Sequence, residues 1–160
     1  MNTFIKFNDK VIAVTKFIAG LAFVIMVISS SAQVVCRFVL NMPLPWSEEL
    51  SRYTFVWSTM LGIAIYMRGR KHSSVDVLEK MLSESARRRL LIVNDLLCEV
   101  FFLIMIYGGF KIVHVTMRQF SPALNVRMGY MYLSVPVSGI IMFLMSAENL
   151  AKIFTKGTEK

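Results

Sequence analysis

Few residues in this 160-residue sequence could carry out covalent or metal chemistry. The two cysteines, Cys36 and Cys98, form no Cys-x-x-Cys pair and have no histidine at metal-ligand spacing. Both lie in hydrophobic stretches, which argues against a structural disulfide. The two histidines, His72 and His114, fall at opposite ends of predicted membrane spans, so they cannot be the paired axial ligands of one haem. The sequence also lacks a glycine-rich phosphate loop and a serine–histidine arrangement. We therefore expect no enzyme activity and no cofactor.

Two acidic residues one helical turn apart, Asp95 and Glu99, interrupt an apolar stretch. A carboxylate at the bilayer centre costs about 2.5–3.5 kcal/mol, so such residues need a role. Three interpretations stay open. The pair could lie structurally at the interface beside an arginine cluster, it could contact a basic residue of a partner, or it could be the proton site of an autonomous, homodimeric four-helix transporter.

The composition identifies the surroundings of these residues. Apolar residues make up 56 % of the chain and charged residues 18 %, against roughly 45–50 % and about 25 % in soluble domains. This indicates an integral membrane protein and excludes nearly every soluble enzyme of this size. The net charge of +8 does not indicate a nucleic-acid partner, because lysine and arginine gather in cytoplasmic loops and beside anionic lipids.

A bilayer core of about 30 Å needs roughly 20 helical residues. The sequence predicts an all-α membrane protein with a single domain over residues 1–160 and four spans, at residues 17–38, 46–67, 90–117 and 128–147. Between the second and third spans, apolar residues recur on one helical face over residues 74–83. This pattern predicts a short amphipathic surface helix, and the alternative is a solvated turn.

Lysine and arginine predict the orientation. The N-terminal segment holds three, the loop between spans two and three holds seven, and the C-terminal tail holds three, against two and three in the other loops. The positive-inside rule therefore places both termini in the cytoplasm. The residues expected at lipid headgroups are Arg68, Arg70, Lys71, Arg87, Arg88 and Arg89.

The segment from Arg37 to Arg52 forms the predicted external turn between spans one and two. Prolines stop the first helix and start the next, and Trp46 suits the membrane interface. Glu48 and Arg52 stand four apart in the order that favours an intrahelical pair. A bridge from Arg37 to Glu48 or Glu49 would join the two spans. The residues with a predicted structural or partner-docking role are Arg37, Trp46, Ser47, Glu48, Glu49 and Arg52.

This turn resembles the small membrane subunit of tripartite ATP-independent periplasmic (TRAP) transporters, the DctQ-type family. The matching pattern is an arginine, Arg37, nine residues before Trp46-Ser47-Glu48-Glu49-Leu50. Weaker matches extend over nearly the whole chain: Gly69, His72, Val75, Asp76, the Ser121–Leu124 run and Pro136. Arg70 and Lys71 make the middle loop more basic than the family pattern.

The resemblance implies a non-catalytic scaffold in the bacterial inner membrane. In this family the small subunit pairs with a large polytopic (DctM-type) subunit that carries the sodium and substrate sites. A periplasmic binding protein delivers an organic acid to that pair. Known substrates are carboxylates, and the chain is most similar to the sialic-acid branch. Small residues let membrane helices approach closely, so the partner-facing positions are expected to include Gly20, Gly62, Gly108 and Gly109.

Overall fold

The computed structural model describes residues 2–68 and 84–156 and is helical throughout those residues apart from its connections. The helices are α1 (Asn2–Phe38), α2 (Pro45–Arg68), α4 (Glu84–Thr116), the single turn α5 (Gly129–Tyr132) and α6 (Ser134–Lys156). The predicted all-α class is confirmed. The predicted surface helix at residues 74–83 and the basic residues Arg70 and Lys71 lie outside the described residues.

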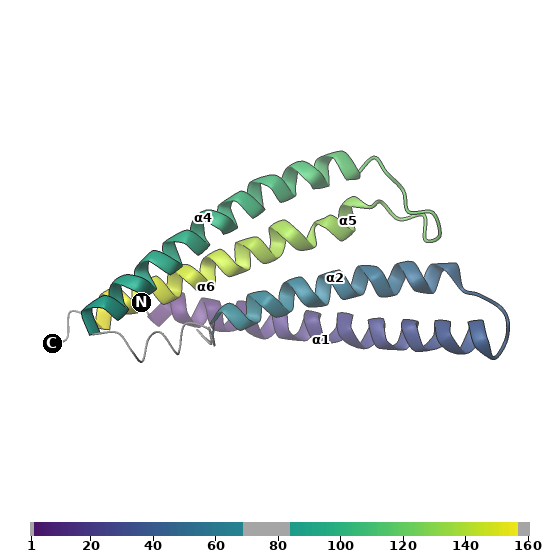
Figure 1. Cartoon of the computed structure of the whole chain (residues 1–160), viewed down its shortest axis with the longest axis horizontal. Coiled ribbons are helices and arrows are strands. Elements are labelled where there is room, and N and C mark those ends of the chain that lie inside the picture. The colour runs from purple at the N-terminus through teal and green to yellow at the C-terminus, as the bar shows by residue number, and fades with distance from the viewer. Residues whose placement is uncertain (1, 69–83, 157–160) are drawn as a thin grey trace.

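The helices form two antiparallel hairpins, α1 with α2 and α4 with α5 and α6 (Figure 1). The hairpins converge where α1 begins and α6 ends, and they diverge toward the opposite end, which carries the α1–α2 turn (Figure 1). We call these the closed end and the open end. Helix α2 packs on α6 between the hairpins, and α1 touches α6 less.

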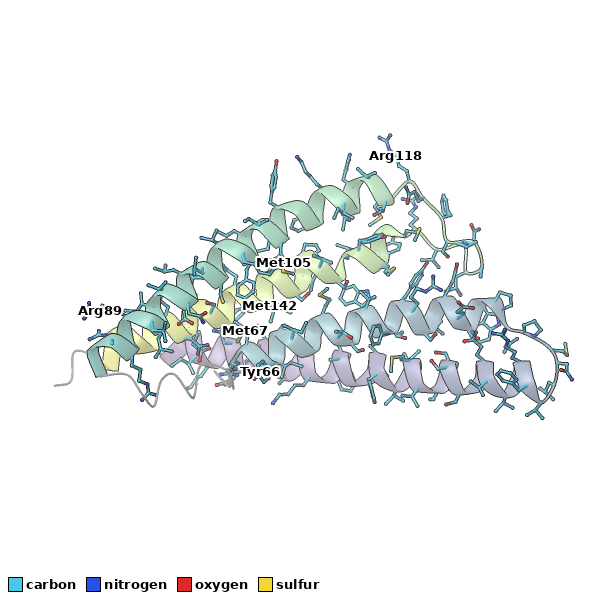
Figure 2. All side chains as sticks on the ribbon, viewed as in Figure 1. Tyr66, Met67, Arg89, Met105, Arg118 and Met142 are labelled. Atoms are coloured by element: carbon cyan, nitrogen blue, oxygen red, sulfur yellow. The ribbon has the colours of Figure 1, made fainter. Side chains whose placement is uncertain are left out.

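Apolar side chains fill the seam between the hairpins near the closed end. Ala64, Met67, Phe102 and Met142 are buried there together. Met67, Met105 and Met142 from α2, α4 and α6 line this seam (Figure 2). The outer faces are apolar as well, with many large side chains exposed on α1 and α4. An apolar exterior over an apolar core is expected where the surrounding medium is lipid.

Within residues 2–68 and 84–156, three helical stretches are long and apolar enough to span a membrane: Phe4–Phe38, Ala86–Thr116 and Gly129–Ala151. They include the predicted first, third and fourth spans. Helix α2, the predicted second span, has 24 residues, long enough for a bilayer but less hydrophobic than the others. The four-span count therefore stays a prediction.

Two helices differ from the sequence pattern. Helix α1 begins at Asn2, fifteen residues before the start of the predicted first span at residue 17. Asn8, Ile12 and Thr15 are buried on one side of this added segment, which packs against the rest of the bundle. The fourth predicted span is divided at Leu133 into α5 and α6. Pro136 has no N–H for the carbonyl of Tyr132, so the helix is interrupted one turn before the proline.

One of the four glycines expected to face a partner, Gly109, instead lies at a helix contact within the subunit. A Cβ on Gly109 would lie 2.8 Å from Pro136 Cδ, so this glycine lets α4 and α6 approach closely. Gly20, Gly62 and Gly108 have open space beside them. Those three positions stay available to a partner, whereas Gly109 is explained by packing within the subunit.

Candidate functional site

The external turn folds at the open end of the bundle. Pro45 opens α2 with a fixed backbone angle, and Ser47 is completely buried, its hydroxyl donating to the Leu44 carbonyl at 2.8 Å. Asn41 has φ 53°, a left-handed conformation that asparagine tolerates and that reverses the chain after α1. The two consecutive glutamates that follow point to different neighbours.

Glu48 faces the first hairpin. Its carboxylate pairs with Arg52 at 3.0 Å, which confirms the intrahelical pair, and accepts a hydrogen bond from Gln33 of α1 at 3.4 Å. The expected bridge from Arg37 is wrong. Among the described residues Arg37 forms no ion pair, and its guanidinium lies 5.8 Å from the Phe38 ring. Gln33, one helical turn before Arg37 on α1, makes the contact with Glu48 that was expected of Arg37.

Glu49 faces the second hairpin. Its two carboxylate oxygens accept the backbone N–H groups of Ala123 at 3.2 Å and Leu124 at 2.9 Å, and the residue is only 8 % exposed. Charge-assisted hydrogen bonds of this kind are stronger than neutral ones. A carboxylate on α2 therefore holds the connection between α4 and α5.

That connection, residues 117–128, is a compact loop. The Ser121 N–H donates to the Val126 carbonyl at 2.9 Å, and Phe120 pairs with Arg127 in a single antiparallel bridge. Asn125 takes a positive φ of 53° at the tip. These local bonds present the amides of Ala123 and Leu124 toward Glu49. A second hydrogen bond joins the two hairpins two turns further along α2, where Trp57 Nε1 donates to the Tyr130 carbonyl of α5 at 3.1 Å.

A surface hollow of about 580 Å³ opens where α2 and the loop meet. It is lined by Pro45, Trp46, Glu48, Glu49, Arg52, Pro122 and Ala123. Four of the six residues predicted for the docking turn therefore share one site. Ser47 is buried beneath the turn and Arg37 lies away from the hollow, while Pro122 and Ala123 come from a distant segment that the first turn alone does not indicate. Contact with a partner at this hollow stays a prediction.

A polar cluster at the closed end was not predicted from the sequence. Asn8 Nδ2 donates to Glu148 at 2.7 Å, and Arg68 pairs with Asp9 and lies 3.8 Å from Glu148. Asn149 Nδ2 donates to the Met67 carbonyl at 3.1 Å. This closed-end cluster joins α1, α2 and α6, and Glu148 is 2 % exposed. The sequence signal for this cluster is Glu148-Asn149, two polar residues that directly follow the predicted fourth span within the apolar helix α6.

The six residues expected at lipid headgroups divide into three groups. Arg87, Arg88 and Arg89 are exposed at the start of α4, and Figure 2 shows Arg89 at the closed end, opposite Arg118. The Arg68 side chain is 22 % exposed and bonded in the closed-end cluster. Arg70 and Lys71 lie outside the described residues. Headgroup contact stays a prediction for all six.

Asp95 and Glu99 lie on α4 with different surroundings. Asp95 is 6 % exposed and has interactions within the chain, whereas Glu99 is partly exposed. The two cysteines are free and belong to α1 and α4, and the described residues hold no group of three metal-ligating side chains. A contact with a basic residue of a partner stays a prediction for the acidic pair.

The family model of the DctQ component of tripartite ATP-independent periplasmic transporters matches residues 11–156. A putative TRAP transporter small permease protein of Haemophilus influenzae is 26 % identical, over 97 % of this chain and 92 % of its own length. The sialic acid TRAP transporter small permease protein SiaQ of Vibrio cholerae is 28 % identical, over 74 % of this chain and 68 % of its own length.

A third relative is a much longer protein. The sialic acid TRAP transporter permease protein SiaT of Haemophilus influenzae is 29 % identical over 69 % of this chain, and the match covers only 18 % of SiaT. The apolar helices, the Trp46–Leu50 turn and a family match over most of the chain lead to one conclusion: this protein belongs to the DctQ family, as a multi-pass inner-membrane component of a TRAP transporter.

Proposed function

We propose that the chain is a non-catalytic scaffold subunit of a sodium-coupled, binding-protein-dependent importer of organic acids. The observation that carries this proposal is the use of the buried charges. Of the three buried carboxylates among the described residues, Glu49 accepts two backbone amides at the open end and Glu148 bonds to Asn8 and Arg68 at the closed end. The third, Asp95 of α4, also has interactions within the chain. Apolar side chains lie between Glu49 and Glu148. Groups that hold one arrangement together suit a static element better than a moving ion carrier.

The proposed topology has four spans with both termini in the cytoplasm. Asp9 and Gln33, which bond to opposite ends of α2, are separated by about 36 Å along α1 at helical rise. This exceeds a hydrocarbon core of about 30 Å. Because α2 accompanies α1 between those two links, a membrane crossed by α1 is crossed by α2 as well. The lysine and arginine distribution then assigns the closed end to the cytoplasm.

The proposed partners are a large polytopic transport subunit and a periplasmic binding protein. In SiaT the stretch similar to this chain is part of a single chain more than five times as long as that stretch. This supports a permanent association with a large permease in the membrane. The hollow beside Trp46 is at the open end, which the topology places in the periplasm, and we assign it to the docking face for the binding protein.

The proposed substrate class is an organic acid carrying a carboxylate. Two relatives are named for sialic acid, and others for C4-dicarboxylates. The identities to these relatives lie between 22 % and 29 %, so they favour neither substrate over the other. In this proposal the choice is made by the large subunit and the binding protein.

Purification from native membranes tests the proposal. The tagged chain is extracted in mild detergent, and the proteins that accompany it are identified and quantified by mass spectrometry. We expect one polytopic membrane protein at a fixed ratio to the chain. Recovery of the chain as a lone homo-oligomer that takes up substrate after reconstitution would overturn the proposal.

A further inference from the structure

An open groove of about 350 Å³ lies among α1, α2 and α6, apart from the external turn and the closed-end cluster. Its walls are almost entirely apolar, and Lys10 stands at one edge. The lining residues include Lys10, Val14 and Ile18 of α1, Trp57 of α2, and Val137 and Ile141 of α6. The indole of Trp57 is held in place by its bond to the Tyr130 carbonyl, so this wall is fixed.

In the proposed topology the groove lies toward the cytoplasmic end of α1. Lys10 is adjacent to Asp9, the residue that pairs with Arg68 at the closed end. From Lys10 to Ile18 the groove runs about 12 Å along α1, so it extends from the segment before the predicted first span to the start of that span at residue 17. An extended acyl chain lying beside α1 would follow it from the headgroup region toward the bilayer centre.

The shape limits what can enter. The groove volume of about 350 Å³ has room for roughly a dozen groups the size of a water molecule, at about 30 Å³ each. This suits one hydrocarbon chain, whereas an α-helix with side chains is about 10–12 Å across. The helix of a partner could cover the groove but could not fill it.

The charge at the edge selects the headgroup. Lys10, Val14 and Ile18 follow one another at four-residue intervals, so they stay within about 80° of one another around α1 and all line the groove. Lys10 is thus the cation at the edge of the apolar wall. We propose that the groove is a binding site for an anionic glycerophospholipid, with one acyl chain between α1 and α6 and the phosphate at Lys10. This site is additional to the scaffold role.

Native mass spectrometry of the full-length chain, kept with the subunits that accompany it, tests the site. The washed protein is offered phosphatidylglycerol or phosphatidylcholine, and the lipid retained per chain is measured. Lys10→Gln is expected to weaken phosphatidylglycerol retention about fivefold, the contribution of one lysine near a lipid surface. Ile141→Trp, which fills the groove, should abolish it.

Lys16→Gln is the matched control, because Lys16 is exposed on the same helix but turned by about 120° from Lys10. It should retain phosphatidylglycerol like the unmodified chain. Lys10 is exposed, so its substitution tests the proposal even where Ile141→Trp fails to fold. Equal loss from Lys10→Gln and Lys16→Gln, equal retention by all variants, or no retention by any of them would each overturn the proposal.

Discussion

The two ends of the bundle join the same hairpins by different means. At the open end a single carboxylate, Glu49, holds the backbone of a loop. At the closed end, side chains of α1, α2 and α6 bond mainly to one another around Glu148. The open end presents a hollow beside its link, whereas Asn8 and Glu148 at the centre of the closed-end cluster are buried between the helices. The difference suggests that one end fixes the fold and the other combines a fixed loop with an accessible surface.

The largest effect is expected at the closed end. Glu148→Ala leaves the buried Asn8 amide without its carboxylate acceptor and removes one of the two carboxylates near Arg68, which keeps Asp9. Leaving a buried polar group without its partner costs about 1–3 kcal/mol, and more where a charged group is involved. The free energy of unfolding, measured by detergent titration with circular dichroism, should fall by that order. Glu148→Gln retains an acceptor for Asn8 and should fall less. A change in Glu148→Ala no larger than in the exposed Glu48→Ala would contradict the assigned role.

Helix α4 offers a matched pair of adjacent glycines, of which only Gly109 packs against α6. Gly109→Ala puts a methyl group against Pro136, and such overpacking costs about 1–3 kcal/mol. Gly108→Ala meets open space within the subunit and should leave its stability nearly unchanged. The same unfolding titration compares them. If Gly108→Ala is the more harmful variant in the isolated subunit, the α4–α6 contact is assigned incorrectly.

At the open end the expected effect is local. Glu49→Ala removes the acceptor of the Ala123 and Leu124 amides, so their protection from hydrogen exchange should fall by about tenfold or more, the value of one such charged bond. Amides in the centre of α6 should be unaffected. The neighbouring Glu48→Ala is the control, since the Glu48 carboxylate bonds to Gln33 and Arg52 and not to the Ala123 and Leu124 amides. Loss of protection in both variants alike would remove the distinction between the two glutamates.

The smallest effect is expected at the second link of the open end. Trp57→Phe keeps an aromatic ring but removes the N–H that the Tyr130 carbonyl accepts. The expected loss is about 1 kcal/mol, typical of one neutral hydrogen bond. The measurement is the free energy of unfolding, with Trp46→Phe as a control on an exposed tryptophan. A larger loss from Trp46→Phe would show that the exposed ring contributes more to the fold than this bond does.

The open end could be predicted from the sequence better than the closed end. The turn follows from local rules: proline at the start of a helix, acidic residues in its first turn, and a pair four residues apart. These rules predicted the Glu48–Arg52 bond and the grouping of Trp46 with both glutamates. They could not predict that Glu49 faces residues 123–124, because the loop's position depends on how the two hairpins pack.

The closed-end cluster depends entirely on tertiary structure. Asn8 and Glu148 are 140 residues apart, and neither lies in a motif. Their hydrophobic surroundings predict a membrane helix but do not indicate which polar groups will meet. The predicted Arg37 bridge was wrong for a related reason. The sequence indicates how far along α1 a residue lies, but not which side of α1 faces α2, and the packing turns Gln33 rather than Arg37 toward Glu48.

Uptake by proteoliposomes tests the central claim, that this chain supports transport without performing it. Vesicles receive this chain alone, its large partner alone, or both, with the binding protein and a sodium gradient, and are offered sialic acid or a C4-dicarboxylate. The scaffold account predicts uptake only when both subunits are present, with the same preferred substrate when the small subunit carries Glu49→Ala. Uptake by this chain alone, or a changed substrate preference in that variant, would contradict it.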